Sequence, residues 1–562
     1  MAPVTSFYGR FRSGHLETCM QPPIRIHMPG EQGVVLVNGV IHTLDPAAPT
    51  VSALAAGHTI LYAGSDAKEA VRILPRARVV DLHGRAVIPG LIDSHMHFLH
   101  EGQMLSEMNI YWKSKEEVLR LVAEEAAHRA PGEWIIGRGW NHEAWDDKVW
   151  PDKADLDAVA PANPVALSRA DHHSMWVNSA ALELAGIGAD SADPQGGEIL
   201  RRPDGSPSGI LVDTGMFAVW QALPPLSDEE TLRLCLLAQE EMLGMGITSI
   251  GNANQNVRTH EIFARAVENG HLKIRIYDML TTHSDEDIAW LAMGRGPELG
   301  TFGGRLSANA IKIVADGSLG SRSAWLLRDY ADRPGHPGNA RYGDEELLEL
   351  VMRGRAHGFQ PCVHAIGDAA VRQAVRVYEK VLSAHPLPDH RFRIEHFQIA
   401  RPEDIRKAAS LGIIPAMQAV HLASDWEMAE HRLDPAALDD AYPWRDILDA
   451  GSVIAGGSDA PMDIVNPFCG IYASVSRRDL HGAPVGGWRP RQAMTREEAF
   501  KSYTVWAAHA EFGEGCKGML KPGMFADFAV LDRDIMVCPE DDIKDTKALL
   551  TVVGGEVVHD VL

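Results

Sequence analysis

Residues 86–97 read AVIPGLIDSHMH, an apolar run that ends in two histidines separated by one residue. In a β-strand, residues i and i+2 point to the same side, so the imidazoles of His95 and His97 can reach one ion. The pair alone is weak evidence, because 26 histidines in 562 residues produce such spacings by chance. Its position counts for more, since a parallel barrel holds its active site at the C-terminal ends of its strands.

Seven more apolar runs follow this one, and helical intervals separate many of them. The expected strands cover residues 86–95, 247–252, 273–280, 308–317, 359–368, 391–400, 412–421 and 452–461, with helices over intervals such as 227–244, 344–357, 369–383 and 402–411. This alternation predicts an α/β fold, a (β/α)8 TIM barrel. The spacing breaks after strand one, where residues of about 100–235 are expected to form a large insertion.

The two ends of the chain have a different pattern, with short β-type runs separated by Gly, Pro and Asn. These runs lie at 34–38, 40–44, 59–63, 78–82, 526–531 and 549–561. They predict a composite β-sandwich domain formed by both chain ends. The expected organisation is an N-terminal arm over 1–32, sandwich parts over 33–87 and 516–562, and the barrel over 88–515.

Composition limits the partners of the protein. Acidic residues outnumber basic ones by 76 to 53, for a formal charge of -23, which disfavours nucleic acids and anionic membrane surfaces. The six cysteines are far apart and form no CxxC pair, as expected for reduced thiols in a cytoplasmic protein. No stretch reaches the ~18 uninterrupted apolar residues of a membrane helix. The expected partner is a small-molecule substrate, and a homodimer is left open.

Ligand-type residues stand at the ends of later strands as well. They are Lys312, His364, His396 and Asp459. Each one alone could be a buried core residue or a member of an ion pair, but their recurrence in barrel order favours a metal centre. Imidazole and carboxylate are the donors of a divalent ion such as zinc. Such an ion lowers the pKa of bound water to roughly 7, and Asp459 could take and pass on its proton.

Several longer strings resemble the amidohydrolase superfamily, and within it amidohydrolase family 3, the branch of N-substituted formamide deformylases. They are VIPGLIDSHMHFLHEG, EWIIGRGWNHEAW, DHHSMWVNSAAL, KIVADGSLGSRSA, VHAIGDAA, RIEHFQ, GGSDAPM and GMLKPGMFADFAVLD. The resemblance runs from about residue 34 to 562. It implies a barrel with a composite sandwich and the metal ligands His95, His97, Lys312, His364, His396 and Asp459, with Asp459 and His364 as the catalytic residues.

The resemblance also gives Lys312 a role. In relatives with two metal ions, this lysine carries a carbamate formed with carbon dioxide, whose oxygens bridge the ions. A carbamylated Lys312 therefore implies two ions. An unmodified lysine implies one ion, with Lys312 paired to Asp316. Zinc is the expected metal in both cases.

Candidate substrate-binding residues come from the insertion and from the segment after strand four. They are His173, Trp140, Trp176, Ser318 and Arg322. Aromatic and imidazole groups above a barrel suit an apolar substrate with one polar handle. The alternative for the tryptophans is that they pack the insertion. The resemblance points to His173 in particular, although His172 stands where relatives more often have glycine.

The expected activity is metal-dependent hydrolysis of a carbon–nitrogen bond in an amide, an N-substituted formamide or a cyclic amide. Deamination of an aminated heterocycle is the alternative within the same chemistry. A non-catalytic binding or regulatory barrel is the alternative from another class, and the loss of a ligand would indicate it. All six ligand positions are present.

Overall fold

The computed structural model describes residues 33–562 except 171–173, 195–196 and 282–284. The expected N-terminal arm over 1–32 and the candidate residue His173 therefore lie outside the described residues. The chain forms two compact units. The larger unit joins the chain up to Gly102 with Cys235–Leu562, and the smaller unit spans Gln103–Leu234.

Eight parallel strands form a barrel in the larger unit, and they follow chain order around it. They are β8 (Leu91–Met96), β15 (Ile247–Gln255), β16 (Arg275–Thr281), β18 (Leu306–Val314), β19 (Gln360–Ala365), β20 (Arg393–His396), β21 (Ile414–Gln418) and β22 (Ala455–Gly457). The barrel closes between its last and first strands, where the backbone N–H of Asp459 donates to the carbonyl of His95 at 2.7 Å. The predicted TIM barrel is confirmed.

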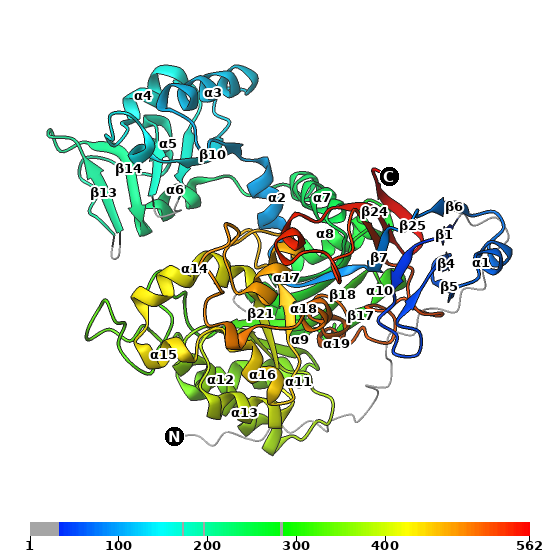
Figure 1. The fold of residues 1–562 in the computed structure, drawn as a ribbon. Coiled ribbons are helices and arrows are strands. Elements are labelled where there is room, and N and C mark those ends of the chain that lie inside the picture. The colour runs from blue at the N-terminus through cyan, green and yellow to red at the C-terminus, as the bar shows by residue number, and fades with distance from the viewer. Residues whose placement is uncertain (1–32, 171–173, 195–196, 282–284) are drawn as a thin grey trace. The chain divides into compact units, whose positions relative to one another are not determined.

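The helices around the barrel are amphipathic. On α12 (Asp368–Ala384), Val371, Ala374, Val375 and Tyr378 are buried at the i, i+3, i+4 spacing of one helical face. Figure 1 shows α11 (Asp344–Ala356), α12 and α13 (Pro402–Leu411) side by side on the outside of the barrel. α11 packs on β18 and β19, and α12 packs on β19, so the strand ends remain to hold the polar residues of the site.

The run at 86–95, expected as one strand, is two strands that belong to different sheets. β7 (Ala86–Pro89) pairs with the sandwich strands β2 (Val40–His42) and β23 (Phe528–Leu531), whereas β8 enters the barrel. Gly90 separates them at a close approach, because a Cβ there would lie 2.2 Å from Oγ1 of Thr248. An apolar run cannot reveal this change of sheet.

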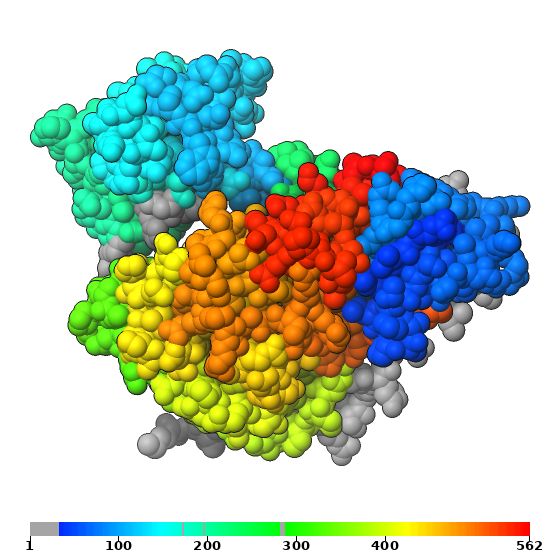
Figure 2. Space-filling model, in the orientation of Figure 1, coloured from blue at the N-terminus to red at the C-terminus, as the bar shows by residue number. Residues whose placement is uncertain are grey.

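Both chain ends build the sandwich. One sheet has the order β5-β4-β1-β6 and the other the order β25-β24-β23-β7-β2-β3. Leu36 and Leu54 of the first sheet share an apolar core with Phe528 and Leu550 of the second. Figure 2 shows N-terminal (blue) and C-terminal (red) residues as neighbours on the surface of this domain. The remaining strands are β1 (Val34–Val37), β3 (Thr50–Val51), β4 (Ala53–Ala56), β5 (Ile60–Gly64), β6 (Arg78–Asp81), β24 (Ala548–Val553) and β25 (Glu556–Asp560).

The smaller unit has its own six-stranded sheet and its own aromatic core. The sheet order is β13-β14-β12-β11-β10-β9, formed by β9 (Met108–Asn109), β10 (Ile135–Trp140), β11 (Val165–Arg169), β12 (Ser174–Val177), β13 (Gly197–Arg201) and β14 (Pro207–Asp213). Trp140, Trp145 and Trp176 pack together in its core. Within the described part of the chain, no helix is long and apolar enough to cross a membrane.

Candidate metal centre

Three ligand atoms from the first and last barrel strands converge on one point. His95 is the next-to-last residue of β8, His97 follows this strand, and Asp459 follows β22. Nε2 of His95 lies 3.4 Å and Nε2 of His97 lies 3.1 Å from Oδ1 of Asp459. These three side chains form a donor group whose ligand atoms all lie within 4.8 Å of one another. The structure therefore brings together three of the residues that the sequence predicts as metal ligands, His95, His97 and Asp459.

The protonation of this group fits a bound cation. Nδ1 of His95 faces a carboxylate oxygen of Glu395, and a carboxylate can only accept, so Nδ1 carries the proton and Nε2 carries a lone pair. That lone pair faces Oδ1 of Asp459, which is buried and makes no well-formed hydrogen bond with any described residue. Nζ of Lys312 lies 3.0 Å from the same Nε2 and can donate to it, whereas the buried anionic Oδ1 of Asp459 has no such donor, and a cation between Oδ1 and the imidazoles would supply the positive partner. The residues present thus fit a divalent metal.

A second donor group shares Asp459 and includes a residue that the sequence did not indicate. It consists of His396, His421 and Asp459. His421 lies in the first turn of α14 (Ala419–Arg432), three residues beyond the end of β21. The expected strand over 412–421 ended at this histidine, which was the available signal. It was missed because His421 belongs to the helix that follows the strand.

Lys312 lies near the C-terminal end of β18. Its Nζ is 3.0 Å from Nε2 of His95, and the side chain is buried. Burial lowers the pKa of this ammonium, because the charged form loses its hydration. The structure therefore places Lys312 beside His95, in surroundings that favour the neutral amine over the ammonium.

The imidazole ring of His364 contacts the ring of His396, but Nε2 of His364 points toward Asp316 and Gly317. Its ring centroid lies 4.4 Å from that of His396, while Nε2 is 3.4 Å from Oδ1 of Asp316 and 3.5 Å from the carbonyl of Gly317. Asp316, considered above as an ion-pair partner of Lys312, accepts backbone N–H groups of the loops around it instead. These donors belong to Trp325, Ile366 and Gly367.

The buried ion pair of Glu395 and Arg393 orients His95 through its Nδ1 atom. Glu395 contacts Nδ1 of His95 and accepts from Nε and Nη2 of Arg393 at 2.8 and 2.9 Å. Arg393 also donates to the carbonyl of Ser94. Burial alone would raise the pKa of Glu395, but Arg393 and His95 hold it well below its usual range. The ionised carboxylate therefore fixes both the tautomer and the position of His95.

The backbone at the site is held in an uncommon conformation. His396 and Asp459 have φ angles of 73° and 63°, in the left-handed region; a short polar residue such as Asp tolerates this region, so the strain falls mainly on His396. Gly457 allows the approach of β22 to β8, because a Cβ there would lie 2.7 Å from the backbone N of His95. Such strain persists where the surrounding structure fixes a functional side chain.

A chain of buried polar groups supports the segment that follows His97. The backbone N–H of Phe98 donates to Oδ1 of Asn252 at 3.0 Å, and Nδ2 of Asn252 donates to Asp278 at 2.7 Å. The other oxygen of Asp278 lies 2.6 Å from Nδ1 of His260 on α8 (Val257–Glu268). Burial would lower the pKa of His260, but Asp278 and Glu298 outweigh that effect and raise it to about 9.

This pair predicts a pH dependence of stability. Because the pKa of His260 is raised on folding, its contribution is complete below the unfolded value of roughly 6.5 and is lost as the pH rises through about 9. We expect the free energy of unfolding to fall by up to about 3 kcal/mol over this interval. Denaturant titrations of wild type and His260→Gln across this range measure the effect. Parallel stability curves would contradict the assignment.

The substrate-binding candidates lie in different surroundings. Trp140 and Trp176 are fully buried in the core of the smaller unit, where their indole N–H groups donate to the carbonyls of Leu167 and Asp152. This is the packing role that the sequence left open for them.

The two candidates after strand four lie in the loop that follows β18. The guanidinium of Arg322 is bonded to Asp332 at 2.7 and 3.1 Å. Ser318 is exposed and joins a hydroxyl cluster with Ser321. The carbonyl of Gly317, one residue before Ser318, lies near Nε2 of His364, so the loop reaches the site through its backbone.

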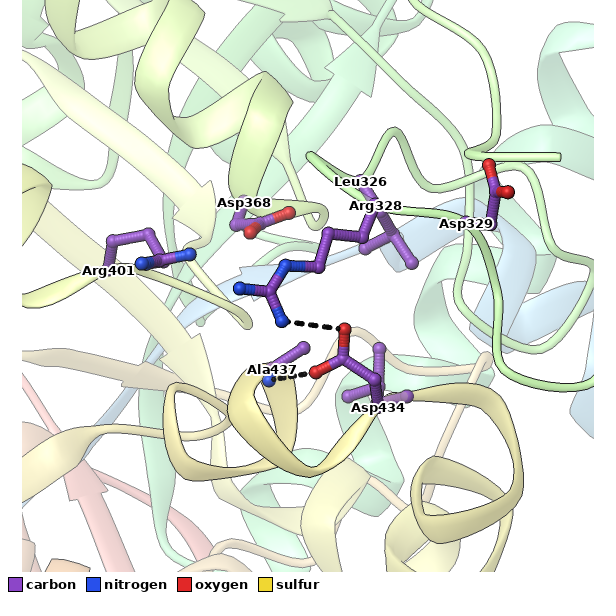
Figure 3. A pocket seen from close by; sticks show the side chains of 8 residues that line it. Leu326, Arg328, Asp329, Asp368, Arg401, Asp434 and Ala437 are labelled. Carbon is purple, nitrogen blue, oxygen red and sulfur yellow. Dashed lines mark hydrogen bonds and ion pairs between the residues drawn. The ribbon is translucent and has the colours of Figure 1, made fainter. Parts of the chain in front are cut away.

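A small pocket elsewhere in the larger unit contains none of the predicted ligands. It is lined by Leu326, Arg328, Asp329, Asp368, Arg401, Leu433, Asp434 and Ala437. Figure 3 shows the guanidinium of Arg328 reaching across it to Asp434, with which it forms an ion pair at 3.0 Å. Arg328 and Asp434 of this pocket therefore neutralise each other.

Imidazole and carboxylate donors at the strand ends of a TIM barrel are an arrangement that suits a metal-dependent hydrolase. Comparisons with known proteins agree with this class. The chain belongs to the amidohydrolase family, since the family 3 model, described as "Amidohydrolase family", matches residues 78–559. The resemblance stated from the motifs is confirmed.

Three relatives show how far the similarity extends. Protein LONG AFTER FAR-RED 3 of Arabidopsis thaliana is 30% identical over 94% of this chain and 91% of its own length. The N-substituted formamide deformylase of Arthrobacter pascens is 27% identical over 93% of this chain and 97% of its own. A crystal structure of an uncharacterized metal-dependent hydrolase from Pyrococcus horikoshii has 26% identity and a TM-score of 0.75, covering 90% and 99% of the two chains.

Proposed function

We propose that the protein hydrolyses the carbon–nitrogen bond of an amide, an N-substituted formamide or a cyclic amide, with zinc as its metal. The observation that carries this proposal is the convergence of His95, His97 and Asp459. The similarity to a relative named as an N-substituted formamide deformylase supports the choice of bond. A divalent ion bound by such donors supplies an activated water and polarises the carbonyl group of the substrate.

The proposed work of Asp459 is proton transfer. Burial alone would raise its pKa, but contact with His97 and the neighbouring imidazoles hold it well below the usual range. The side chain is thus an ionised base at neutral pH. Its carboxylate takes a proton from the attacking water and gives it to the departing nitrogen, which cannot leave readily as an anion.

Lys312 is proposed to carry a carbamate. The neutral amine, favoured by burial, attacks carbon dioxide through its nitrogen lone pair, forms an N–C bond and releases one proton. The product is an anion with two oxygen donors in place of a cation. This form accounts for a buried lysine beside a ligand histidine and fits two ions, whereas the unmodified amine fits one ion.

The proposed substrate is a small molecule, and the proposed location is the cytoplasm. Among the described residues, Cys235, Cys362, Cys469 and Cys538 are free thiols. Free thiols are typical of a reducing compartment. The homodimer stays a prediction.

A substrate panel tests the activity. N-substituted formamides, cyclic amides and aminated heterocycles are incubated with the metal-loaded protein, and products are identified by mass spectrometry. Release of formate or another carboxylate supports the proposal, and release of ammonia from a heterocycle supports the deaminase alternative. If every substrate class matches the blank measured with Asp459→Asn, the proposal is wrong.

A further inference from the structure

The segment around the end of α19 (Val505–Ala510) meets the barrel at the N-terminal ends of its strands. The side chain of Gln360, the first residue of β19, donates to the carbonyl of Ala510 at 3.0 Å. Arg391, two residues before β20, donates to the carbonyl of His509 at 2.7 Å. The metal centre lies at the C-terminal ends of the strands, so this segment lies at the opposite end of the barrel.

The same segment places a buried ion pair against the barrel strands. Nζ of Lys517 donates to Oε2 of Glu511 and, at 2.6 Å, to Oγ of Ser249 on β15. Glu511 is fully buried and Lys517 is only 6% exposed. The other carboxylate oxygen, Oε1 of Glu511, is buried and has no hydrogen-bond partner among the described residues. A buried anionic oxygen without a donor is costly unless another positive charge lies near it.

Arg393, the first residue of β20, brings such a charge to this oxygen. Its Nη2 donates to the carbonyl of Ser94 at 2.8 Å, and its Nη1 is buried without a partner in the described part of the chain. Gly251 shows how close the two groups are, because a Cβ built on it would lie 2.1 Å from that carbonyl oxygen and 3.2 Å from Oε1 of Glu511. An unsatisfied donor and an unsatisfied acceptor therefore lie around the same carbonyl group.

Arg393 connects Glu511 to the metal ligand through its charge. Burial would lower the pKa of Arg393, but Glu395 above all, and Glu511 with it, raise this pKa above its ordinary value. Arg393 also donates to both oxygens of Glu395, whose carboxylate contacts Nδ1 of His95. Buried charges are screened much less than exposed ones. Side chains of alternating charge therefore form a row through the barrel, in the order Lys517, Glu511, Arg393 and Glu395, and the row ends at His95.

We propose that Glu511 is a positioning residue for the metal ligand His95 and acts through Arg393 and Glu395 from the opposite end of the barrel. With Glu511 present, the charge of Arg393 is shared between two carboxylates, so Glu395 remains a strong acceptor for Nδ1 of His95 and keeps Nε2 directed at the metal. Without Glu511, Arg393 interacts with Glu395 alone, and this carboxylate becomes a weaker acceptor. The inference rests on the proposed function in one respect, namely that His95 binds a metal ion.

Zinc affinity and the Nδ1 proton of His95 test this role. The zinc dissociation constants of the full-length wild type and Glu511→Gln are measured by competition with a chelator, and Glu511→Gln is expected to bind zinc about 2–30-fold more weakly. The Nδ1 proton is observed by NMR in the full chain as purified, labelled with ¹⁵N-histidine, and is identified by its absence in His95→Ala. Its resonance is expected to move to higher field in Glu511→Gln, because the hydrogen bond to Glu395 weakens.

Asp527→Asn is the matched control for the loss of a buried carboxylate. Asp527 accepts from Arg275 at 2.6 and 2.9 Å, and both side chains are buried. Arg275 is the first residue of β16, as Arg393 is of β20, so the control removes a buried carboxylate at the same end of the barrel but outside the row of charges. It is expected to lower the free energy of unfolding, as Glu511→Gln does, and to leave the zinc affinity and the His95 resonance unchanged.

The outcomes separate the possible failures. If Glu511→Gln changes the zinc affinity and the His95 resonance no more than Asp527→Asn does, Glu511 supports only the fold and the inference is wrong. If the wild type binds no zinc, the proposed function fails, and the His95 resonance still decides whether Glu511 acts on this histidine. If Glu511→Gln does not fold, Lys517→Met is added to it, because removing both charges costs less stability than leaving one buried and unpaired. The double variant is expected to show the same loss of zinc affinity.

Discussion

Replacement of Asp459 by Asn is expected to lower turnover by about 10²–10⁴-fold while metal remains bound. The amide keeps the shape and one oxygen donor of the carboxylate, but it cannot accept a proton at neutral pH. The chain supplies several other donors around the site, in particular His95, His97 and His396. The effect should therefore fall on kcat more than on metal content.

The measurement combines steady-state kinetics with metal analysis of the same preparation. Asp463→Asn is a suitable control, because Asp463 follows Asp459 by four residues and its carboxylate is bonded to the hydroxyl of Ser424 outside the donor groups. This control is expected to retain near-normal turnover. If Asp459→Asn does so as well, proton transfer must be assigned to another group.

Replacement of Glu395 by Gln is expected to damage both stability and metal binding. Arg393 is completely buried, and its charge would lose the carboxylate that neutralises it. Removing one partner of a buried pair costs about 3–5 kcal/mol of unfolding free energy. Nδ1 of His95 would also lose an ionised acceptor, and loss of such support lowers metal affinity by roughly 10–100-fold.

Denaturant titration and metal affinity are measured together, with Glu403→Gln as the control. Glu403 pairs with Arg372 at an exposed position on α13, so its removal should change stability by no more than about 1 kcal/mol. Equal effects of the two substitutions would show that the buried pair has no special role.

Much of the fold follows from local pattern. Each of the eight apolar runs overlaps a barrel strand, and the alternation of these runs with helical intervals is visible in the sequence. The division of residues 86–95 between two sheets is not visible, because it depends on the close packing of Gly90 against Thr248. Such contacts between residues distant in the chain leave no local signal.

Four of the predicted ligands lie close to one another in the structure because their positions follow from the barrel strands. His95, His97, His396 and Asp459 lie at or just after strand ends, and the structure brings them into the donor groups. His421 lies beyond its strand, in the first turn of a helix. The direction of Nε2 of His364 is set by a side-chain rotamer beside Asp316, and rotamers cannot be read from a sequence.

The burial of the insertion tryptophans shows a second limit of predicting binding residues from a sequence. Trp140 and Trp176 occur in motifs that suit a binding surface, but their rings are enclosed in an aromatic core. An aromatic residue serves either purpose equally well in a sequence, since both use its large apolar area. Only the packing of the folded unit separates the two roles.

The central claim is that the donors at the barrel strand ends hold a divalent metal ion. Metal analysis of the full chain, purified without chelators, tests this claim most directly, because these donors lie within a few ångströms of one another. The result predicted is one to two equivalents of zinc or a similar divalent ion per chain, lost when His95 and His97 are both replaced by Ala. A chain that holds no metal as purified, and takes up none when zinc, manganese or cobalt is added, would contradict it.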